Sequence, residues 1–116
     1  MSRLVVRSGG PLRGRVRMPG DKSIAQRAVL LGALAEGESR ITGFPPSGDC
    51  LATVACVRGL GVEVGGEVVL VVRGRGLGGL RAPVGPLDCV RSGTTMRLLV
   101  GVLAGAYGGA TVSEWL

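Results

Sequence analysis

Three polar side chains at the start of one predicted helix have the types and the spacing of an anion-binding site. Lys22, Ser23 and Arg27 follow a Pro19-Gly20 turn, and Ser23 and Arg27 are four residues apart and share a helix face. The N-terminus of a helix carries roughly half a positive charge, so cations are unfavourable there. An anion between these cations and the exposed backbone N–H groups removes the conflict. We therefore expect a phosphate or carboxylate site at this helix.

The type of cation strengthens this expectation. Lys22 is the only lysine among 14 basic residues. A compact ammonium suits a position where one atom must approach two groups as a point charge, whereas arginine offers a planar fork. The alternative is a single lysine kept by chance on a solvated helix end. We favour the anion site because the neighbouring Ser23 and Arg27 also fit it.

A second stretch repeats this arrangement about 70 residues later. A small polar loop runs into an apolar helix, predicted from about Thr95 to Tyr107, with a cation in its first turn. Gly93 lets the backbone come close to a ligand, and Ser92, Thr94 and Thr95 offer hydroxyl groups. The sequence therefore predicts two loop-to-helix junctions of one type.

Alternating strands and helices must position these junctions. Residues 12–18 alternate between apolar or small residues and arginine, which predicts a half-buried strand with a basic outer face. Asp21 caps the helix that follows, apolar on nearly every side and hence buried, and Gly37 closes it. Further expected elements are a strand at 40–44, a turn at 45–49, a helix ending at Gly59 or Gly61, a hairpin over 62–72 and a loop at 73–79.

We expect the carboxylates to cap helices rather than to act in catalysis. Ser47 or Asp49 can cap the second helix, and for Asp49 we favour a cap over a catalytic group.

The recurring order of strand, helix, strand, helix and hairpin suggests a structural repeat, with a second copy beginning near the end. The final residues 110–116 read as the beginning of a further strand.

The composition indicates a layered α/β protein. It is 46% hydrophobic but has one Phe, one Tyr and one Trp, so Val, Leu, Ile and Ala must form the core. No apolar run could span a membrane and no signal-peptide core is visible, so we expect a cytoplasmic location. Cys50, Cys56 and Cys89 lack metal-ligand spacing and histidine is absent, which excludes a zinc site of the usual kinds. We expect all three cysteines to be small buried side chains.

The net charge of +6 leaves two classes of partner open. Nucleic acid is one, but the arginines are scattered and the chain lacks the aromatic residues on which single strands stack. Electrostatic steering of small, highly anionic substrates is the other. We favour the second and expect neither nucleic acid nor a membrane as partner.

At several places the residues carry a resemblance to a known family. The chain resembles EPSP synthase, or 3-phosphoshikimate 1-carboxyvinyltransferase, in order and spacing over nearly its whole length. The similar segments are Pro19-Gly20-Asp21-Lys22-Ser23-Ile24, Leu34-Ala35-Glu36-Gly37, Ser47-Gly48-Asp49, Leu60-Gly61-Val62 and Ser92-Gly93-Thr94-Thr95-Met96-Arg97-Leu98-Leu99. UDP-N-acetylglucosamine enolpyruvyl transferases are less similar, because their first motif lacks the Asp-Lys-Ser…Arg pattern.

The resemblance implies a fold and an activity. The fold is an inside-out α/β barrel of βαβαββ units, here incomplete, with a first repeat at 12–84 and the start of a second at 85–116. The activity is transfer of the enolpyruvyl group of phosphoenolpyruvate to the 5-hydroxyl of shikimate 3-phosphate, a step of aromatic amino-acid biosynthesis. Neither a metal nor an organic cofactor is implied.

The resemblance also implies roles for five residues. Lys22 would contact both substrates and act in catalysis. Ser23 and Arg27 would bind shikimate 3-phosphate, while Gly93 and Thr94 would line the phosphoenolpyruvate site. The residue types and their spacing indicate the same groups: a point cation, a planar guanidinium for phosphate and a bare backbone near an anion.

Two pairs of residues depart from the family pattern. Val90-Arg91 stands where the family usually has Gly-Asn, and Ala25-Gln26 replaces a more usual Ser-His or Ser-Asn pair. Family members are also several times longer, so we expect an N-terminal fragment that lacks its C-terminal portion and is inactive alone. The alternative is a self-contained basic module that binds phosphorylated metabolites or RNA.

Overall fold

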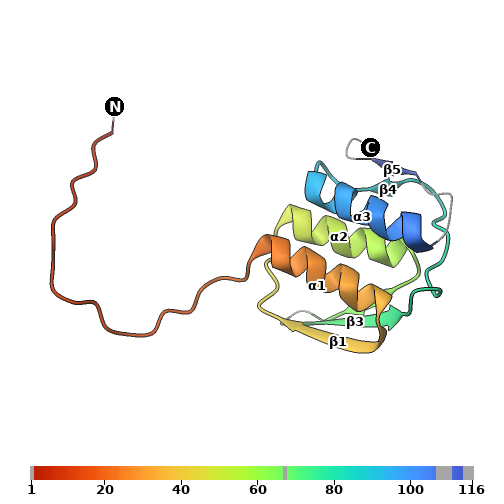
Figure 1. Cartoon of the computed structure of the whole chain (residues 1–116), viewed down its shortest axis with the longest axis horizontal. Coiled ribbons are helices and arrows are strands. Elements are labelled where there is room, and N and C mark those ends of the chain that lie inside the picture. The colour runs from red at the N-terminus through yellow and green to blue at the C-terminus, as the bar shows by residue number, and fades with distance from the viewer. Residues whose placement is uncertain (1, 67, 107–110, 114–116) are drawn as a thin grey trace.

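The structure, a computed structural model, describes residues 2–66, 68–106 and 111–113 (Figure 1). Its elements are α1 (Lys22–Leu34), β1 (Glu36–Thr42), α2 (Gly48–Gly59), β2 (Glu63–Gly65), β3 (Val69–Arg75), β4 (Leu87–Asp88), α3 (Gly93–Ala106) and β5 (Val112–Ser113). The alternation of helices and strands confirms the expected α/β class. None of the described helices is long and apolar enough to cross a membrane.

One antiparallel sheet and a layer of three helices form the folded body. The sheet has the order β1-β3-β2, with Val72 of β3 opposite both Ser39 and Val64. The helices α1, α2 and α3 lie side by side, and α1 packs on the sheet (Figure 1). A second, parallel pair joins β4 to β5 beside α3. The three helices therefore begin close together, which is what brings the two predicted junctions into one region.

Aliphatic side chains form the core between these layers, as the composition predicts. They come from all three helices, from the C-cap of α2 and from β2, β3 and β4: Val29, Leu30, Ala33, Val54, Val57, Leu60, Val64, Leu70, Val72, Leu87, Leu99 and Leu103. Cys50, Cys56 and Cys89 are buried free thiols, as expected. Close packing explains Gly74, since a Cβ there would overlap the Ala35 carbonyl at the end of α1.

The prediction of a strand at 12–18 is wrong. Residues 2–20 form an extended arm that runs away from the body and belongs to neither sheet (Figure 1). Leu12 and Val16 are 100% and 83% exposed. A strand needs a neighbour for its backbone N–H and C=O groups, and the alternation of side chains does not supply one. The radius of gyration of 18.0 Å reflects this arm, since a compact domain of this length has about 13 Å.

Some helices and strands begin or end at other residues than expected, because a glycine does not end the first helix. The first helix ends at Leu34, and Gly37, with φ of +91°, pairs with Gly74 inside β1 instead of closing the helix. The expected strand at 40–44 accordingly begins earlier, at Glu36, and the expected loop at 73–79 begins only after Arg75. The hairpin of β2 and β3 is confirmed. Tyr107 and most of 110–116 lie outside the described residues.

The first helix is less buried than expected. Ile24 and Leu31, seven residues apart on one face of α1, are both exposed. Leu51 of α2 and Val100 of α3 are exposed as well. The layer of helices thus has apolar side chains on its outer surface, and this bears on the behaviour of the isolated chain.

Candidate functional site

The first junction forms where the arm enters α1. Gly20 lies against the Gly43 carbonyl, which a Cβ at this position would overlap. Asp21 is the N-cap, as predicted, and its Oδ2 accepts a hydrogen bond from the N–H of Ile24 at 2.8 Å. The cap fixes the first turn of α1, and Lys22 is the first residue of that turn.

Ser23 and Arg27 meet on the surface of α1, as their spacing predicts. The Nη1 atom of Arg27 donates to the Ser23 hydroxyl and to the Ser23 backbone carbonyl, the latter at 3.2 Å. Arg27 is exposed, so its remaining N–H groups are accessible from solvent. A hydroxyl and a guanidinium are therefore held together at the end of a helix where an anion is favoured.

Lys22 is paired with Asp49 at the start of α2. Its Nζ atom lies 2.7 Å from Asp49 Oδ2, and the two side chains are 57% and 35% exposed. The hydrogen bond and the charge of Asp49 raise the pKa of Lys22 above its usual value of 10.5. The expectation that Asp49 serves as a cap is wrong, because Ser47 is the N-cap and accepts from the Cys50 N–H at 3.3 Å.

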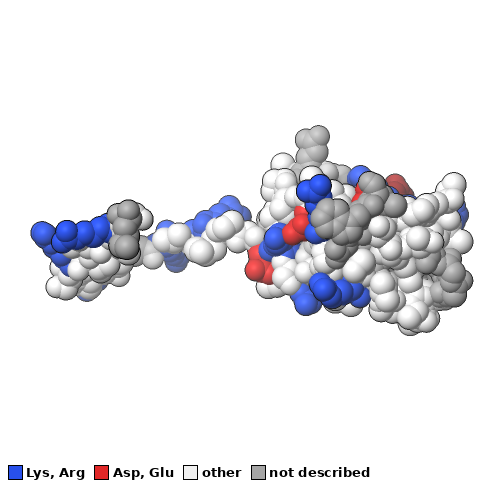
Figure 2. Space-filling model, turned by 90° about the horizontal axis from the view of Figure 1, so that it is seen from above, with Lys and Arg blue, Asp and Glu red and all other residues white. Residues whose placement is uncertain are grey.

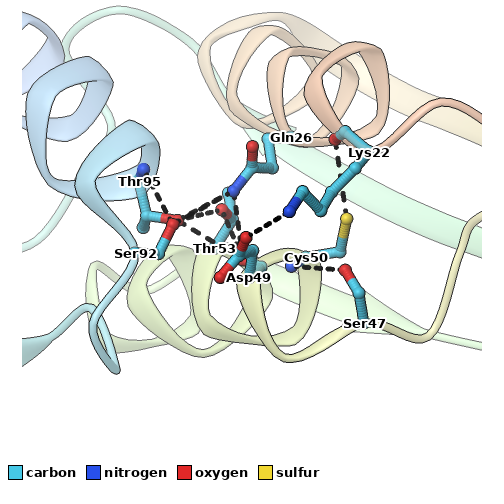
Figure 3. Close-up of polar contacts among 8 residues, drawn as sticks. All are labelled: Lys22, Gln26, Ser47, Asp49, Cys50, Thr53, Ser92 and Thr95. Carbon is cyan, nitrogen blue, oxygen red and sulfur yellow. Dashed lines mark hydrogen bonds and ion pairs between the residues drawn. The ribbon is translucent and has the colours of Figure 1, made fainter. Parts of the chain in front are cut away.

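A buried polar cluster of Gln26, Thr53, Ser92 and Thr95 joins the three helices (Figure 3). The Gln26 Nε2 atom donates to Ser92 Oγ at 3.3 Å and to Thr95 Oγ1 at 3.0 Å. Thr53 of α2 lies 2.9 Å from Thr95, oxygen to oxygen. The Asp49 backbone carbonyl accepts from Gln26, Thr53 and Thr95. This cluster connects the first junction to the second.

The loop before α3 adopts a tight conformation in spite of its sequence. Val90 and Arg91 both have left-handed backbones, with φ of 47° and 61°. The Val90 N–H donates to Asp88 Oδ1 at 2.8 Å, and the Ser92 N–H donates to the Cys89 carbonyl at 2.9 Å. Left-handed conformations suit the Gly-Asn pair usual in the family better than a β-branched valine. The loop thus keeps its turn, but at a cost in backbone strain.

The second junction offers fewer hydroxyls than the sequence suggests. Ser92 is the N-cap of α3, with its Oγ accepting the Thr95 N–H at 3.1 Å, and both hydroxyls are buried within the polar cluster. Thr94 is exposed. Gly93 is helical, so no special backbone angle requires glycine there. A bare backbone at Gly93 and one accessible hydroxyl at Thr94 remain for a ligand.

The structure therefore gathers cations and N–H groups at these helix ends, and three carboxylates of the described residues lie close to them. Basic side chains follow the arm and lie at the end of the body that the arm joins, where acidic ones also lie (Figure 2). Of the nearby carboxylates, Asp21 caps α1, Asp88 holds the Val90 turn and Asp49 pairs with Lys22. Each of these three carboxylates has a partner in the described structure, and the exposed cations can bind an anion.

Sequence reasoning missed Gln26, Thr53 and the true role of Asp49. Its spacing puts Gln26 on the same helix face as Lys22 but gives no sign of buried partners, and Thr53 lies in the middle of an apolar helix. A polar residue at a core-facing position of a helix is a usable signal, because buried polar groups need partners. The partners come from segments up to 69 residues away, so their identity could not be inferred.

Comparison with known proteins agrees with the motifs. The sequence model of the family EPSP synthase (3-phosphoshikimate 1-carboxyvinyltransferase) matches residues 6–113. The 3-phosphoshikimate 1-carboxyvinyltransferase of Alkalilimnicola ehrlichii is 60% identical over 102 residues, which cover 86% of this chain and 23% of that protein. The protein of the same name from Acidithiobacillus ferrooxidans is 56% identical over 107 residues, covering 90% and 25%.

A solved structure gives the same result. The EPSP synthase from Acinetobacter baumannii superposes with a TM-score of 0.80 at 38% identity, over 86% of this chain and 23% of that one. The chain thus spans about a quarter of the length of the relatives it matches. Because the family match extends over most of its residues, this chain belongs to the EPSP synthase family.

Proposed function

We propose that this chain contributes part of the substrate sites of an EPSP synthase. The reaction joins the 5-hydroxyl of shikimate 3-phosphate to the enolpyruvyl group of phosphoenolpyruvate and releases phosphate. Lys22 contacts both substrates and acts in catalysis, Ser23 and Arg27 hold shikimate 3-phosphate, and Gly93 and Thr94 line the phosphoenolpyruvate site. The first repeat comprises residues 12–84 and the second begins at residue 85.

One observation carries this proposal: the two junctions are physically connected. Lys22 reaches Asp49 Oδ2, and the carbonyl of the same Asp49 is bonded to Gln26 and to Thr95 of the second junction. An ammonium ion and the exposed start of α3 therefore lie on neighbouring helix ends. Two anionic substrates bound at these ends would be next to each other, as a transfer reaction between them requires.

The chain alone is not a complete enzyme in this proposal. Protonation of the methylene carbon of phosphoenolpyruvate needs an acid, and the attacking hydroxyl needs a base. The described carboxylates near the site are engaged in a cap, a turn and an ion pair. We assign both proton transfers to the part of the enzyme that follows this chain in its longer relatives. The free thiols of the three cysteines support a reducing, cytoplasmic location.

A chimera tests the proposal. Residues 6–113 of this chain replace the matching segment of the Alkalilimnicola ehrlichii relative, and the unmodified relative is the control. We expect the chimera to release phosphate only when phosphoenolpyruvate and shikimate 3-phosphate are both present. A folded chimera that releases no phosphate would contradict the proposal. Salt-sensitive RNA binding by the 116-residue chain, with no response to shikimate 3-phosphate, would favour the alternative of a basic binding module.

A further inference from the structure

Gln26 occupies an unusual position for an uncharged polar residue. It lies on α1, one turn after Lys22, with only 1% of its surface exposed. Its Nε2 atom is within hydrogen-bond distance of Asp49 O, Ser92 Oγ and Thr95 Oγ1, at 3.2, 3.3 and 3.0 Å. Figure 3 shows its side chain reaching from α1 toward α2 and toward the start of α3.

The chemistry of its neighbours fixes the orientation of the Gln26 amide. The Asp49 backbone carbonyl can only accept hydrogen bonds, so the NH₂ group of Gln26 must face it. The hydroxyls of Ser92 and Thr95 share the second N–H of the same group and are hydrogen-bonded to each other at 2.7 Å. An apolar side chain of the same length would leave these oxygens without this donor, in a region closed to water.

We infer that Gln26 is a positioning residue, which holds the loop before α3 at a fixed distance from Lys22. It touches neither proposed substrate. Its bonds end at Ser92 and Thr95, which flank Gly93 and Thr94, so the loop that faces phosphoenolpyruvate depends on them. This consequence for a ligand rests on the proposed function, whereas the control of the loop does not. Lys22, Ser23 and Arg27 lie on α1 itself and should keep their arrangement without Gln26.

Amide hydrogen exchange on the 116-residue chain tests the control of the loop. We expect Gln26→Met to speed exchange at residues 92–95 by roughly threefold to tenfold, the range that corresponds to the loss of one hydrogen bond. Val29→Ala is the matched control, since Val29 is fully buried on the same helix and makes no bond to the loop. It should lower stability without a selective change at 92–95. Equal changes at 92–95 in both variants, or none in Gln26→Met, would overturn the inference.

Kinetics of the same variants in the chimera test the consequence for the substrates. We expect Gln26→Met to raise KM for phosphoenolpyruvate by the same roughly threefold to tenfold, with KM for shikimate 3-phosphate and kcat within about twofold. Val29→Ala should change neither KM selectively. Equal rises in both KM values would mean that Gln26 only stabilises the fold. An inactive parent chimera would count against the proposed function, while the exchange comparison would still decide the role of Gln26.

Discussion

Lys22 forms an ion pair that a bound anion could replace. Its partner Asp49 lies at 2.7 Å, but both side chains reach solvent, and exposed ion pairs contribute little to stability. A phosphate or carboxylate group of a ligand can therefore replace Asp49 as the partner of the Lys22 ammonium at a small cost in free energy. The hydrogen bond and the charge of Asp49 raise the pKa of Lys22 further above 10.5, so the amine stays protonated with or without a bound anion. Under the proposed function, Asp49 is the group that a substrate anion would displace from Lys22.

Gly93 gives a prediction about ligand approach. Its backbone is helical, so Gly93→Ala should leave the fold intact. The added methyl group would stand at the exposed start of α3, and we expect the chimera to bind phosphoenolpyruvate roughly tenfold more weakly, or by about 1.4 kcal/mol. Affinity for shikimate 3-phosphate, measured by fluorescence titration, should change little. An equal loss for both substrates would indicate a collapsed loop and would contradict the assignment.

Val90 gives a prediction about strain. A β-branched residue with φ of 47° is unfavourable by about 1–2 kcal/mol, and Val90 is 53% exposed, so little burial is lost on its removal. We expect Val90→Gly to raise the free energy of unfolding by about 1 kcal/mol in urea titrations. Val100→Gly is the matched control, because Val100 is 52% exposed but helical. Val100→Gly should lower the free energy of unfolding by about 0.3–0.5 kcal/mol from helix propensity alone. A lower free energy of unfolding in both variants would contradict backbone strain at Val90.

At the scale of single residues, much of the candidate site could be predicted, because the residues that indicate it lie close together in the sequence. Asp21, Lys22, Ser23 and Arg27 fall within two turns of one helix, where spacing decides which side chains meet. Asp49 and the hydroxyls of Ser92 and Thr95 were misjudged because their partners are distant in sequence. A carboxylate in a first turn can cap, pair or titrate, and only the packing of α1 against α2 selects the ion pair.

At the scale of elements, helices and the hairpin were predictable and the first strand was not. Caps and apolar spacing fix α1 and α2 within the chain itself, and the short connection between Gly65 and Val69, which begins one residue later than the expected two-glycine turn, brings β2 next to β3. Residues 12–18 have equally regular alternation, yet lie outside both sheets. Alternation shows which side chains a strand would bury, but pairing depends on another strand being available.

The exposed arm leads to a prediction about stability. Residues 2–18 are exposed throughout, so their deletion should change the free energy of unfolding of the 116-residue chain by less than about 0.5 kcal/mol. Circular dichroism during urea unfolding measures this, with the full chain at the same concentration as control. A loss of about 2 kcal/mol or more would mean that the arm packs on the body in solution.

At the scale of the whole molecule, exposed apolar side chains should govern how the isolated chain behaves. Ile24, Leu31, Leu51 and Val100 lie exposed on the three helices. Contiguous apolar patches promote association, so we expect the chain to self-associate at micromolar concentration in analytical ultracentrifugation. We also expect no phosphate release from phosphoenolpyruvate and shikimate 3-phosphate. A monodisperse monomer with turnover above background would overturn both expectations.

The central claim is that Lys22 belongs to the active site of an EPSP synthase, and one measurement tests it most directly. Phosphate release by the chimera is compared for Lys22→Met and for Arg40→Met, which also removes one positive charge but lies on β1 in an exposed pair with Glu38. We expect Lys22→Met to abolish turnover, because the lost charge-assisted contact costs about 1.5–3 kcal/mol in binding alone and also acts on the transition state. Arg40→Met should retain near-normal turnover. Near-normal turnover by Lys22→Met would contradict the account.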